Sequence, residues 1–163
     1  MVLNANHILD FIPSGLGQCG AKAQCGVDLS VSNIRRIKGG KITQIGKKID
    51  DYEEVDFSEK DGIKTWALPN GVYSLEFDQD VKLDETHSGI IVGRSTTNRV
   101  GCLIRSSWFD PCFECSSIGA TLYVLGDNVV EIEEHSKLAQ LILFETEKSE
   151  AYNGSYKGDK DIK

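Results

Sequence analysis

Apolar residues fall in short runs along most of the chain, and turn-forming residues separate them. From about residue 24 onward the runs are rich in β-branched residues or alternate with polar ones, which is typical of strands. The predicted strands cover residues 27–31, 41–46, 65–77, 89–93, 102–104, 120–125, 128–134 and 137–145. Turns are predicted at Gly39-Gly40, within the third run at Pro69-Asn70-Gly71, and at Gly126-Asp127-Asn128. This pattern predicts a mostly β fold of the sandwich, jelly-roll or barrel type.

Three segments depart from the strand pattern. Residues 5–12 carry apolar side chains at helical spacing and predict one short N-terminal helix, which ends at Pro13-Ser14-Gly15. The polar and acidic stretch 40–64 predicts an elaborated loop or a hairpin. The sequence after Glu147 is polar and rich in Gly and Lys, as in mobile tails. We therefore expect a β domain over residues 1–147 and a flexible tail over 148–163.

Length and charge narrow the functional classes. A chain of 163 residues, 40% hydrophobic and 26% charged, is typical of one soluble globular domain. Its 18 basic and 25 acidic residues give a net charge of −7, which argues against a general nucleic-acid coat but not against a small anionic ligand. The longest apolar stretch, 138–144, is too short to span a bilayer, and the N-terminus lacks a secretory signal. We expect a cytoplasmic protein without membrane or nucleic-acid partners.

The five cysteines are expected to be reduced and without a metal. Cys112 and Cys115 form a C-x-x-C pair, but no second such pair supplies the remaining ligands of a zinc site. Cys19 and Cys25 could complete a zinc site with Cys112 and Cys115, but we favour the absence of a metal at the cysteines. The three histidines are scattered along the sequence and receive no chemical role.

Four islands of polar residues carry candidate chemistry. In the first, Asp28 enters a strand after a glycine, where a carboxylate is either a turn residue or a ligand. In the second, Arg94 and Arg99 flank the hydroxyls of Ser95 and Thr96, which suits a phosphate chain but also a capped helical turn.

The third and fourth islands combine polar and aromatic residues. Asp110 stands between aromatic residues and a proline, as a general base or as an ordinary turn residue. Gln140 interrupts an apolar strand, so its amide must find structural partners or a ligand. The segment from Tyr152 to Gly158 adds Tyr156 and Lys157.

In their order and spacing these islands resemble the dUTPase and dCTP deaminase superfamily, and more closely its dCTP deaminase-like branch. Q-C-G-V-D-L resembles the first motif of the superfamily, and G-R-S-T-T-N-R-V-G resembles the phosphate motif G-R-S-S-x-x-R-x-G. W-F-D-P-C-F-E-C is similar to W-I-D-P-G-F-x-G, and K-L-A-Q-L-I-L-F to R-I-A-Q-L-x-F. Y-N-G-S-Y-K-G is similar to the closing tail, and the first ten residues to the N-terminal helix of that branch.

The resemblance implies a distorted jelly roll that assembles as a homotrimer with active sites between subunits. It implies a deoxynucleoside triphosphate, dUTP or dCTP, as substrate and Mg²⁺ as cofactor. Asp28 would stand near the metal through water, and Asp110 would position the attacking water. The implied substrate-binding residues are Arg94, Ser95, Thr96, Arg99, Phe113 against the deoxyribose, Gln140, and Tyr152, Tyr156 and Lys157 from the tail.

One missing residue favours dUTP hydrolysis over dCTP deamination. The deaminases use a glutamate on the strand after the D-P-G-F-x-G motif as proton shuttle. Here that position falls on Ala120 or, by a second alignment, on Tyr123, and no carboxylate lies between Glu114 and Asp127. Loss of such a proton-transfer group lowers a rate by roughly 10²- to 10⁴-fold. A dCTP deaminase, a bifunctional enzyme, a silent nucleotide-binding regulator and a structural jelly roll remain the alternatives.

The chain also departs from the family pattern. Cys112 and Cys115 replace both glycines of D-P-G-F-x-G, and Lys137 replaces the arginine of R-I-A-Q. The segment between Gly101 and Asp110, which would read the base edge, is about two residues short by comparison with that pattern.

Overall fold

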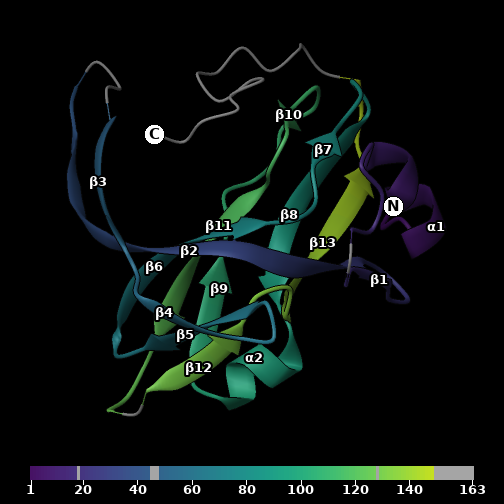
Figure 1. Ribbon diagram of the computed structural model, residues 1–163. Coiled ribbons are helices and arrows are strands. Elements are labelled where there is room, and N and C mark those ends of the chain that lie inside the picture. The colour runs from purple at the N-terminus through teal and green to yellow at the C-terminus, as the bar shows by residue number, and fades with distance from the viewer. Residues whose placement is uncertain (18, 45–47, 128, 149–163) are drawn as a thin grey trace.

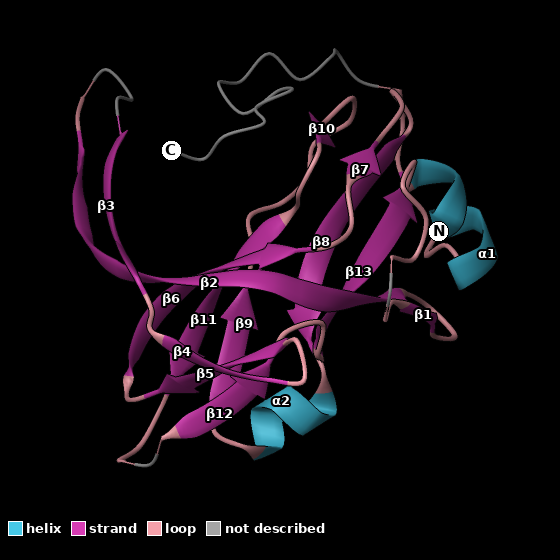
Figure 2. Cartoon of the chain, in the orientation of Figure 1, coloured by secondary structure: helices cyan, strands magenta, loops and turns pink. Residues whose placement is uncertain are grey.

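The computed structural model describes residues 1–17, 19–44, 48–127 and 129–148, and these ranges form a mostly β fold of the distorted jelly-roll type with a short N-terminal helix (Figures 1 and 2). The helical elements are α1 (Ala5–Ile8), η1 (Leu9–Phe11) and α2 (Ser95–Arg99). The strands are β1 (Ala21–Lys22), β2 (Val27–Ile42), β3 (Lys48–Glu54), β4 (Phe57–Lys60), β5 (Ile63–Leu68), β6 (Gly71–Phe77), β7 (Val81–Lys82), β8 (His87–Gly93), β9 (Cys102–Arg105), β10 (Glu114–Cys115), β11 (Gly119–Val124), β12 (Val130–Glu133) and β13 (Lys137–Glu145).

The long strand β2 closes the main sheet on itself. The strand order is β1-β2-β13-β8-β9-β11-β6, and β6 pairs in turn with β2. Beyond β6, the end of β2 pairs with β3 as a hairpin arm that projects from the body in Figure 1. Two smaller sheets, β12-β5-β4 and β10-β7, complete the fold.

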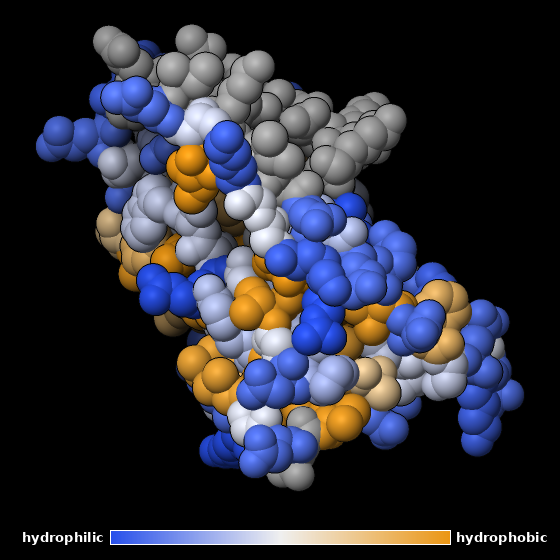
Figure 3. Space-filling view, turned by 90° about the vertical axis from the view of Figure 1, so that its left-hand side faces the viewer, coloured by the Kyte–Doolittle hydropathy of each residue, from blue (hydrophilic) through white to orange (hydrophobic). Residues whose placement is uncertain are grey.

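The inward face of the main sheet forms the core. Leu29, Leu75, Leu122 and Leu141 are fully buried there, and Trp66 of β5 covers one side. Alternation places the neighbouring residues outside, because successive side chains of a strand point to opposite faces. On the face that carries β3 and β6, apolar surface shows only in separate patches among polar side chains (Figure 3).

The predicted helix is confirmed. Asn4 caps α1 by accepting hydrogen bonds from the backbone amides of Asn6 and His7, which an apolar residue could not do. Ala5 and Ile8 bury the apolar face of this short helix, and η1 continues to Phe11, just before Pro13.

The predicted turn at Gly39-Gly40 is wrong. β2 runs straight through both glycines to Ile42, so the stretch after residue 40 begins as an arm rather than as a loop. Gly39 has φ 148° at a register shift between Ile37 and Gly39, so the flexible residue serves a bulge in a continuing strand. Among the described residues, no helix is long and apolar enough to cross a membrane.

Candidate active site

Asp28 on β2, Gln140 on β13 and Arg94 just after β8 lie together on neighbouring strands of the main sheet, and we call them the Asp28 cluster. The Nε2 of Gln140 donates to Asp28 Oδ1 at 2.9 Å, and Arg94 Nε lies 3.3 Å from the same oxygen. The Asp28 side chain is 9% exposed and that of Arg94 32%. The motif residues thus neutralise one another and leave the arginine within reach of solvent.

Two successive carbonyls of β13, at a bulge in its pairing with β2, hold Arg94. The register of β13 against β2 shifts from Lys137↔Ser30 to Ala139↔Leu29, so Leu138 is the extra residue. The carbonyl of Leu138 accepts from the Arg94 amide at 3.1 Å and from Thr97 Oγ1 at 2.7 Å, and the Lys137 carbonyl accepts from Arg94 Nη1 at 3.2 Å.

Thr97 is a positioning residue that the sequence reasoning missed. It is buried, and its hydroxyl fastens α2 to β13. A small polar residue in a helical turn gives no distinct signal by itself. Only the structure shows that its hydroxyl is the second donor to the Leu138 carbonyl, beside the Arg94 amide.

The other predicted phosphate-binding residues lie on α2. Ser95, Thr96 and Arg99 are all exposed, and Ser95 follows directly on Arg94. Thr96 also lines a smaller cavity of about 210 Å³, together with Thr97 and Lys137. Their roles toward a ligand stay predictions.

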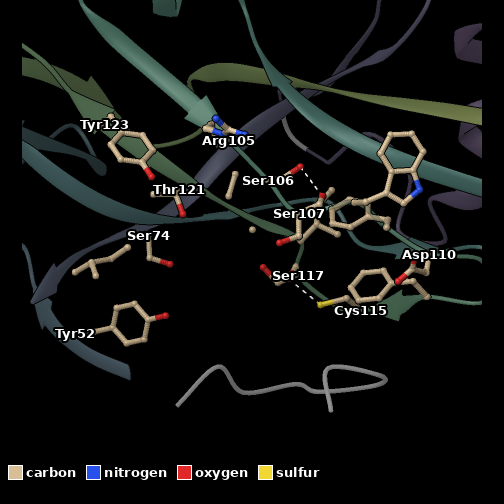
Figure 4. A pocket seen from close by; sticks show the side chains of 17 residues that line it. Tyr52, Ser74, Arg105, Ser106, Ser107, Asp110, Cys115, Ser117, Thr121 and Tyr123 are labelled. Carbon is tan, nitrogen blue, oxygen red and sulfur yellow. Dashed lines mark hydrogen bonds between the residues drawn. The ribbon is translucent and has the colours of Figure 1, made fainter. Parts of the chain in front are cut away.

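Asp110 and Phe113 line a separate open cleft of about 600 Å³, which we call the Asp110 cleft. Phe113 stacks on Phe109 with ring centroids 5.0 Å apart, and Trp108 stacks on Phe144 at 5.4 Å. Aromatic surfaces therefore form the wall of the cleft nearest Asp110 (Figure 4).

A tight turn presents Asp110. The Phe113 amide donates to the Asp110 carbonyl at 3.1 Å, and Cys112, at the third position of the turn, has φ 63°. A positive φ at this position defines a type II turn, which favours glycine. The cysteine that replaces the family glycine therefore keeps the glycine conformation.

A second turn supports the first. The carbonyl of Asp84 accepts from the Cys112 amide at 2.9 Å, and its carboxylate accepts from the Thr86 amide, the Thr86 hydroxyl and His87 Nδ1. Burial alone would raise the pKa of Asp84, but the hydrogen bonds from His87 and Thr86 outweigh it and lower that pKa.

The far side of the cleft carries hydroxyl groups. Tyr52, Ser74, Thr121 and Tyr123 gather opposite the aromatic wall, with Arg105 beside Tyr123 (Figure 4). The sequence reasoning named none of these as binding residues except Tyr123, as one of two candidates for the missing acid. Tyr52 comes from the arm, so only the tertiary pairing of Ile37 with Tyr52 brings it here.

Both candidate positions for the deaminase glutamate line the cleft. Ala120 and Tyr123 lie on β11, and neither brings a carboxylate. Among the described residues that line the cleft, Asp110 is the only carboxylate. The described residues that line the cleft therefore include no second carboxylate at the positions where the sequence comparison found none.

The Asp28 cluster and Asp110 lie toward opposite ends of β8. Arg94 follows Gly93, whereas Phe109, next to Asp110, pairs with Gly89. Four residues of strand separate the two glycines by roughly 13 Å. Within one chain the structure thus brings the motifs into two groups and does not join them.

Tyr152, Tyr156 and Lys157 lie outside the described residues. The five cysteines are all within the described part of the chain, and none of them forms a disulfide. Burial raises the pKa of the Cys102 thiol, which keeps it protonated at neutral pH.

Comparison with known proteins shows the family of the chain. A sequence model described as dCTP deaminase-like matches residues 5–146. The chain belongs to the dCTP deaminase-like family. It is 31% identical over 140 residues to a deoxyuridine 5′-triphosphate nucleotidohydrolase of Methanocaldococcus jannaschii, which covers 83% of this chain and 86% of the relative.

A second relative is similar in sequence, and two solved structures are similar in fold. A probable deoxyuridine 5′-triphosphate nucleotidohydrolase of Halobacterium salinarum is 27% identical over 83% of this chain and 82% of its own. The fold resembles EIAV dUTPase, with a TM-score of 0.54 and 15% identity over 85% of this chain and 92% of that one. It also resembles the dCTP deaminase of Agrobacterium tumefaciens, with a TM-score of 0.63 and 12% identity over 87% of this chain and 47% of that one.

Proposed function

We propose that this protein is a dUTP diphosphatase, which hydrolyses dUTP to dUMP and pyrophosphate with Mg²⁺. The observation that carries the proposal is the composition of the Asp110 cleft, where Asp110 is the only carboxylate among the described residues. The relatives named as deoxyuridine triphosphate nucleotidohydrolases support the same choice.

Deamination and hydrolysis require different catalytic groups in this cleft. Release of ammonia from cytosine needs a proton donor and acceptor at the fourth carbon of the ring, which Ala120 and Tyr123 do not supply as a carboxylic acid. Hydrolysis needs one carboxylate that orients a water toward phosphorus, together with donors for the phosphate charge. The chain supplies the groups that hydrolysis requires, a single carboxylate and several phosphate donors.

Asp110 acts on the water in this mechanism. Its exposed carboxylate accepts a hydrogen bond from the water and directs the water oxygen toward the α-phosphorus. The new bond forms between that oxygen and phosphorus as a proton of the water passes to the Asp110 carboxylate, the bond to the α,β-bridging oxygen breaks, and pyrophosphate leaves. Phe113 packs against the deoxyribose and leaves little room for a 2′-hydroxyl.

The Asp28 cluster holds the triphosphate. Arg94, which is already anchored by two carbonyls, and Arg99 donate to phosphate oxygens, while Ser95, Thr96 and Gln140 add neutral donors. The tail residues Tyr152, Tyr156 and Lys157 are proposed to close over the bound nucleotide.

The donor set of the cluster fits Mg²⁺ that is bound mainly through the substrate. Both contacts to Asp28, from Gln140 and Arg94, fall on Oδ1, and the described residues contain no group of three or more acidic, His or Cys side chains that forms a cage. Mg²⁺ commonly keeps several waters and binds one or two carboxylates plus substrate phosphates. When bound, the ion would neutralise phosphate charge, with Asp28 holding it through water.

We further propose that the protein works as a homotrimer with active sites between subunits. The separation of the Asp28 cluster from Asp110 along β8 supports this, since neighbouring copies can bring the two together. Val92, Leu103 and Trp108 are large apolar residues exposed on or beside β8 and β9, as expected of a surface that another copy covers.

The test is turnover of dUTP and dCTP side by side with Mg²⁺, with the products resolved. We expect dUMP and pyrophosphate from dUTP and no ammonia from dCTP. Ammonia release from dCTP would contradict the proposal. Tight binding of a non-hydrolysable dUTP analogue without turnover would instead indicate a regulator, and no binding at all a structural protein. Sedimentation of the full chain checks the trimer.

A further inference from the structure

Arg105 on β9 is the only cationic side chain among the described residues that line the Asp110 cleft. It is exposed, and its guanidinium has no hydrogen-bond or ion-pair partner within the described part of the chain. Exposure alone assigns no task to an arginine, because most arginines of a folded protein are exposed and solvated. Its place in the sheet is more informative.

The strand register places Arg105 in one cross-strand row with hydroxyl groups. Arg105 pairs with Thr121 of β11, and Thr121 pairs with Ser74 of β6. Directly paired residues carry their side chains on the same face, with Cβ atoms about 4.5–5.5 Å apart. Tyr123, two residues along β11, lies beside Arg105 in the cleft (Figure 4). The wall opposite the aromatic rings therefore presents hydroxyl groups and one guanidinium.

This wall is where the proposed mechanism leaves room for the base. Asp110 directs water to the α-phosphorus and Phe113 packs against the deoxyribose, and both belong to the aromatic side of the cleft. Phosphate and base are attached to opposite ends of the sugar, so the base extends from Phe113 toward the wall that carries Arg105. A cleft of about 600 Å³ has room for a whole nucleoside.

Arg105 differs from the hydroxyl groups in what it can recognise. A serine, threonine or tyrosine hydroxyl donates or accepts a hydrogen bond, so it can pair with either pyrimidine. A guanidinium has N–H donors and no acceptor. The fourth carbon of uracil carries a carbonyl oxygen, which accepts, whereas that of cytosine carries an amino group, which donates. Only the uracil edge is complementary to Arg105.

We propose that Arg105 is a specificity-determining residue that donates to the O4 carbonyl of uracil and thereby selects dUTP over dCTP. This inference rests on the proposed function and deepens it. Hydrolysis takes place at phosphorus, in a triphosphate that dUTP and dCTP share, so the missing acid prevents deamination of dCTP but not its hydrolysis. Cytosine in this cleft would turn N–H groups toward the guanidinium and leave both without partners, which weakens binding.

Two alternative roles for Arg105 lead to different results. An arginine that binds phosphate would serve dUTP and dCTP equally, because their triphosphates are identical. An arginine that only contacts a neighbouring copy would alter sedimentation, and its loss would again weaken both nucleotides to the same extent. The ratio of the two affinities therefore isolates a contact to the base.

The test measures binding of α,β-imido-dUTP and α,β-imido-dCTP, each with Mg²⁺, to the full chain by calorimetric titration. We expect wild type to prefer the dUTP analogue. In Arg105→Met, affinity for the dUTP analogue should fall about tenfold and affinity for the dCTP analogue should stay within about twofold. Arg105→Gln supplies an acceptor for an amino group, so it should bind the dCTP analogue more tightly than Arg105→Met does and release pyrophosphate from dCTP faster than wild type.

Arg99→Met is the matched comparison, because Arg99 is an exposed arginine that we place on the triphosphate. It should weaken both analogues alike. An equal loss for both analogues in Arg105→Met, or an unchanged ratio, would overturn the proposal. If Arg105→Met does not fold, the ratio in Arg105→Gln decides. Failure of wild type to bind either analogue would contradict the proposed function as well, whereas binding of both with an unchanged ratio would overturn only the role of Arg105.

Discussion

The Asp28 cluster and the Asp110 cleft are built by different means. Asp28 and Gln140 lie on paired strands of the main sheet, and the chain itself neutralises the carboxylate of Asp28 through Arg94. Asp110 lies on an exposed turn, and its neighbours in the cleft are aromatic rings and hydroxyl groups. One region is held by the ladder and by charge, and the other by a tight turn and its support.

This difference fits the two tasks that we propose. A triphosphate brings several negative charges, so its site benefits from donors that are fixed before the ligand arrives. A water-orienting carboxylate must stay ionised and accessible, which an exposed turn allows. The comparison therefore predicts that substitutions in the cluster act on affinity and loss of the Asp110 carboxylate on turnover.

The largest effect is expected for Asp110→Asn. This change keeps the size of the side chain but removes the charge that orients the water, so kcat for dUTP should fall about 10²- to 10⁴-fold. Affinity for α,β-imido-dUTP should stay within about threefold of wild type, because the cluster is untouched. Steady-state kinetics and calorimetric titration check the two halves of the prediction. Unchanged kcat would remove Asp110 from the mechanism.

The next effect is expected for Arg94→Ala. It removes a phosphate donor and leaves the nearly buried carboxylate of Asp28 without its cation, so KM should rise about 10- to 100-fold while kcat at saturation changes less. Arg94→Lys is the matched variant, because it keeps the charge but loses the fork that reaches both Asp28 and the Lys137 carbonyl. We expect an intermediate KM for it. A fall in kcat with constant KM would show that the division between cluster and cleft is wrong.

Much of the fold could be predicted from the sequence, because its signals are local. The apolar spacing of α1 and the apolar run that forms β13 each depend on neighbouring residues. The Gly39-Gly40 turn failed because glycine serves bulges as well as turns, and only the pairing of β2 with β3 decides between them.

The sequence motifs named candidate site residues but not their arrangement in space. Ordered motifs named Asp28, Arg94 and Gln140, and the structure brings these three together. It places Asp110 and Phe113 at the other end of β8, which no spacing along the chain reveals. Thr97 was missed because its partner is a backbone carbonyl of β13, which is distant in sequence.

A smaller effect, on stability, is expected for Cys112→Gly. Cys112 has φ 63° in the turn that presents Asp110, and a side chain in this region is strained by about 1 kcal/mol relative to glycine. The variant should therefore unfold at a higher denaturant concentration, with turnover of dUTP kept. Cys115→Gly is the matched control, because β10 places Cys115 in ordinary strand geometry and glycine there should destabilise the protein. If both variants lose stability, the turn is not strained at Cys112.

The smallest effect is a pH dependence at the support of this turn. Because the native pKa of Asp84 is lowered by hydrogen bonds from His87 and Thr86, its ionised carboxylate stabilises the fold at pH values above the unfolded pKa of about 3.9. That contribution is lost as the pH falls through the lowered native pKa. Asp84 is half exposed, so solvent screening should keep the effect below about 1 kcal/mol. Urea unfolding should show wild type more stable than Asp84→Asn at pH 7, with the difference disappearing as the pH falls through the lowered native pKa of Asp84. A difference that grows on acidification would mean that the carboxylate does not support the Asp110 turn through these bonds.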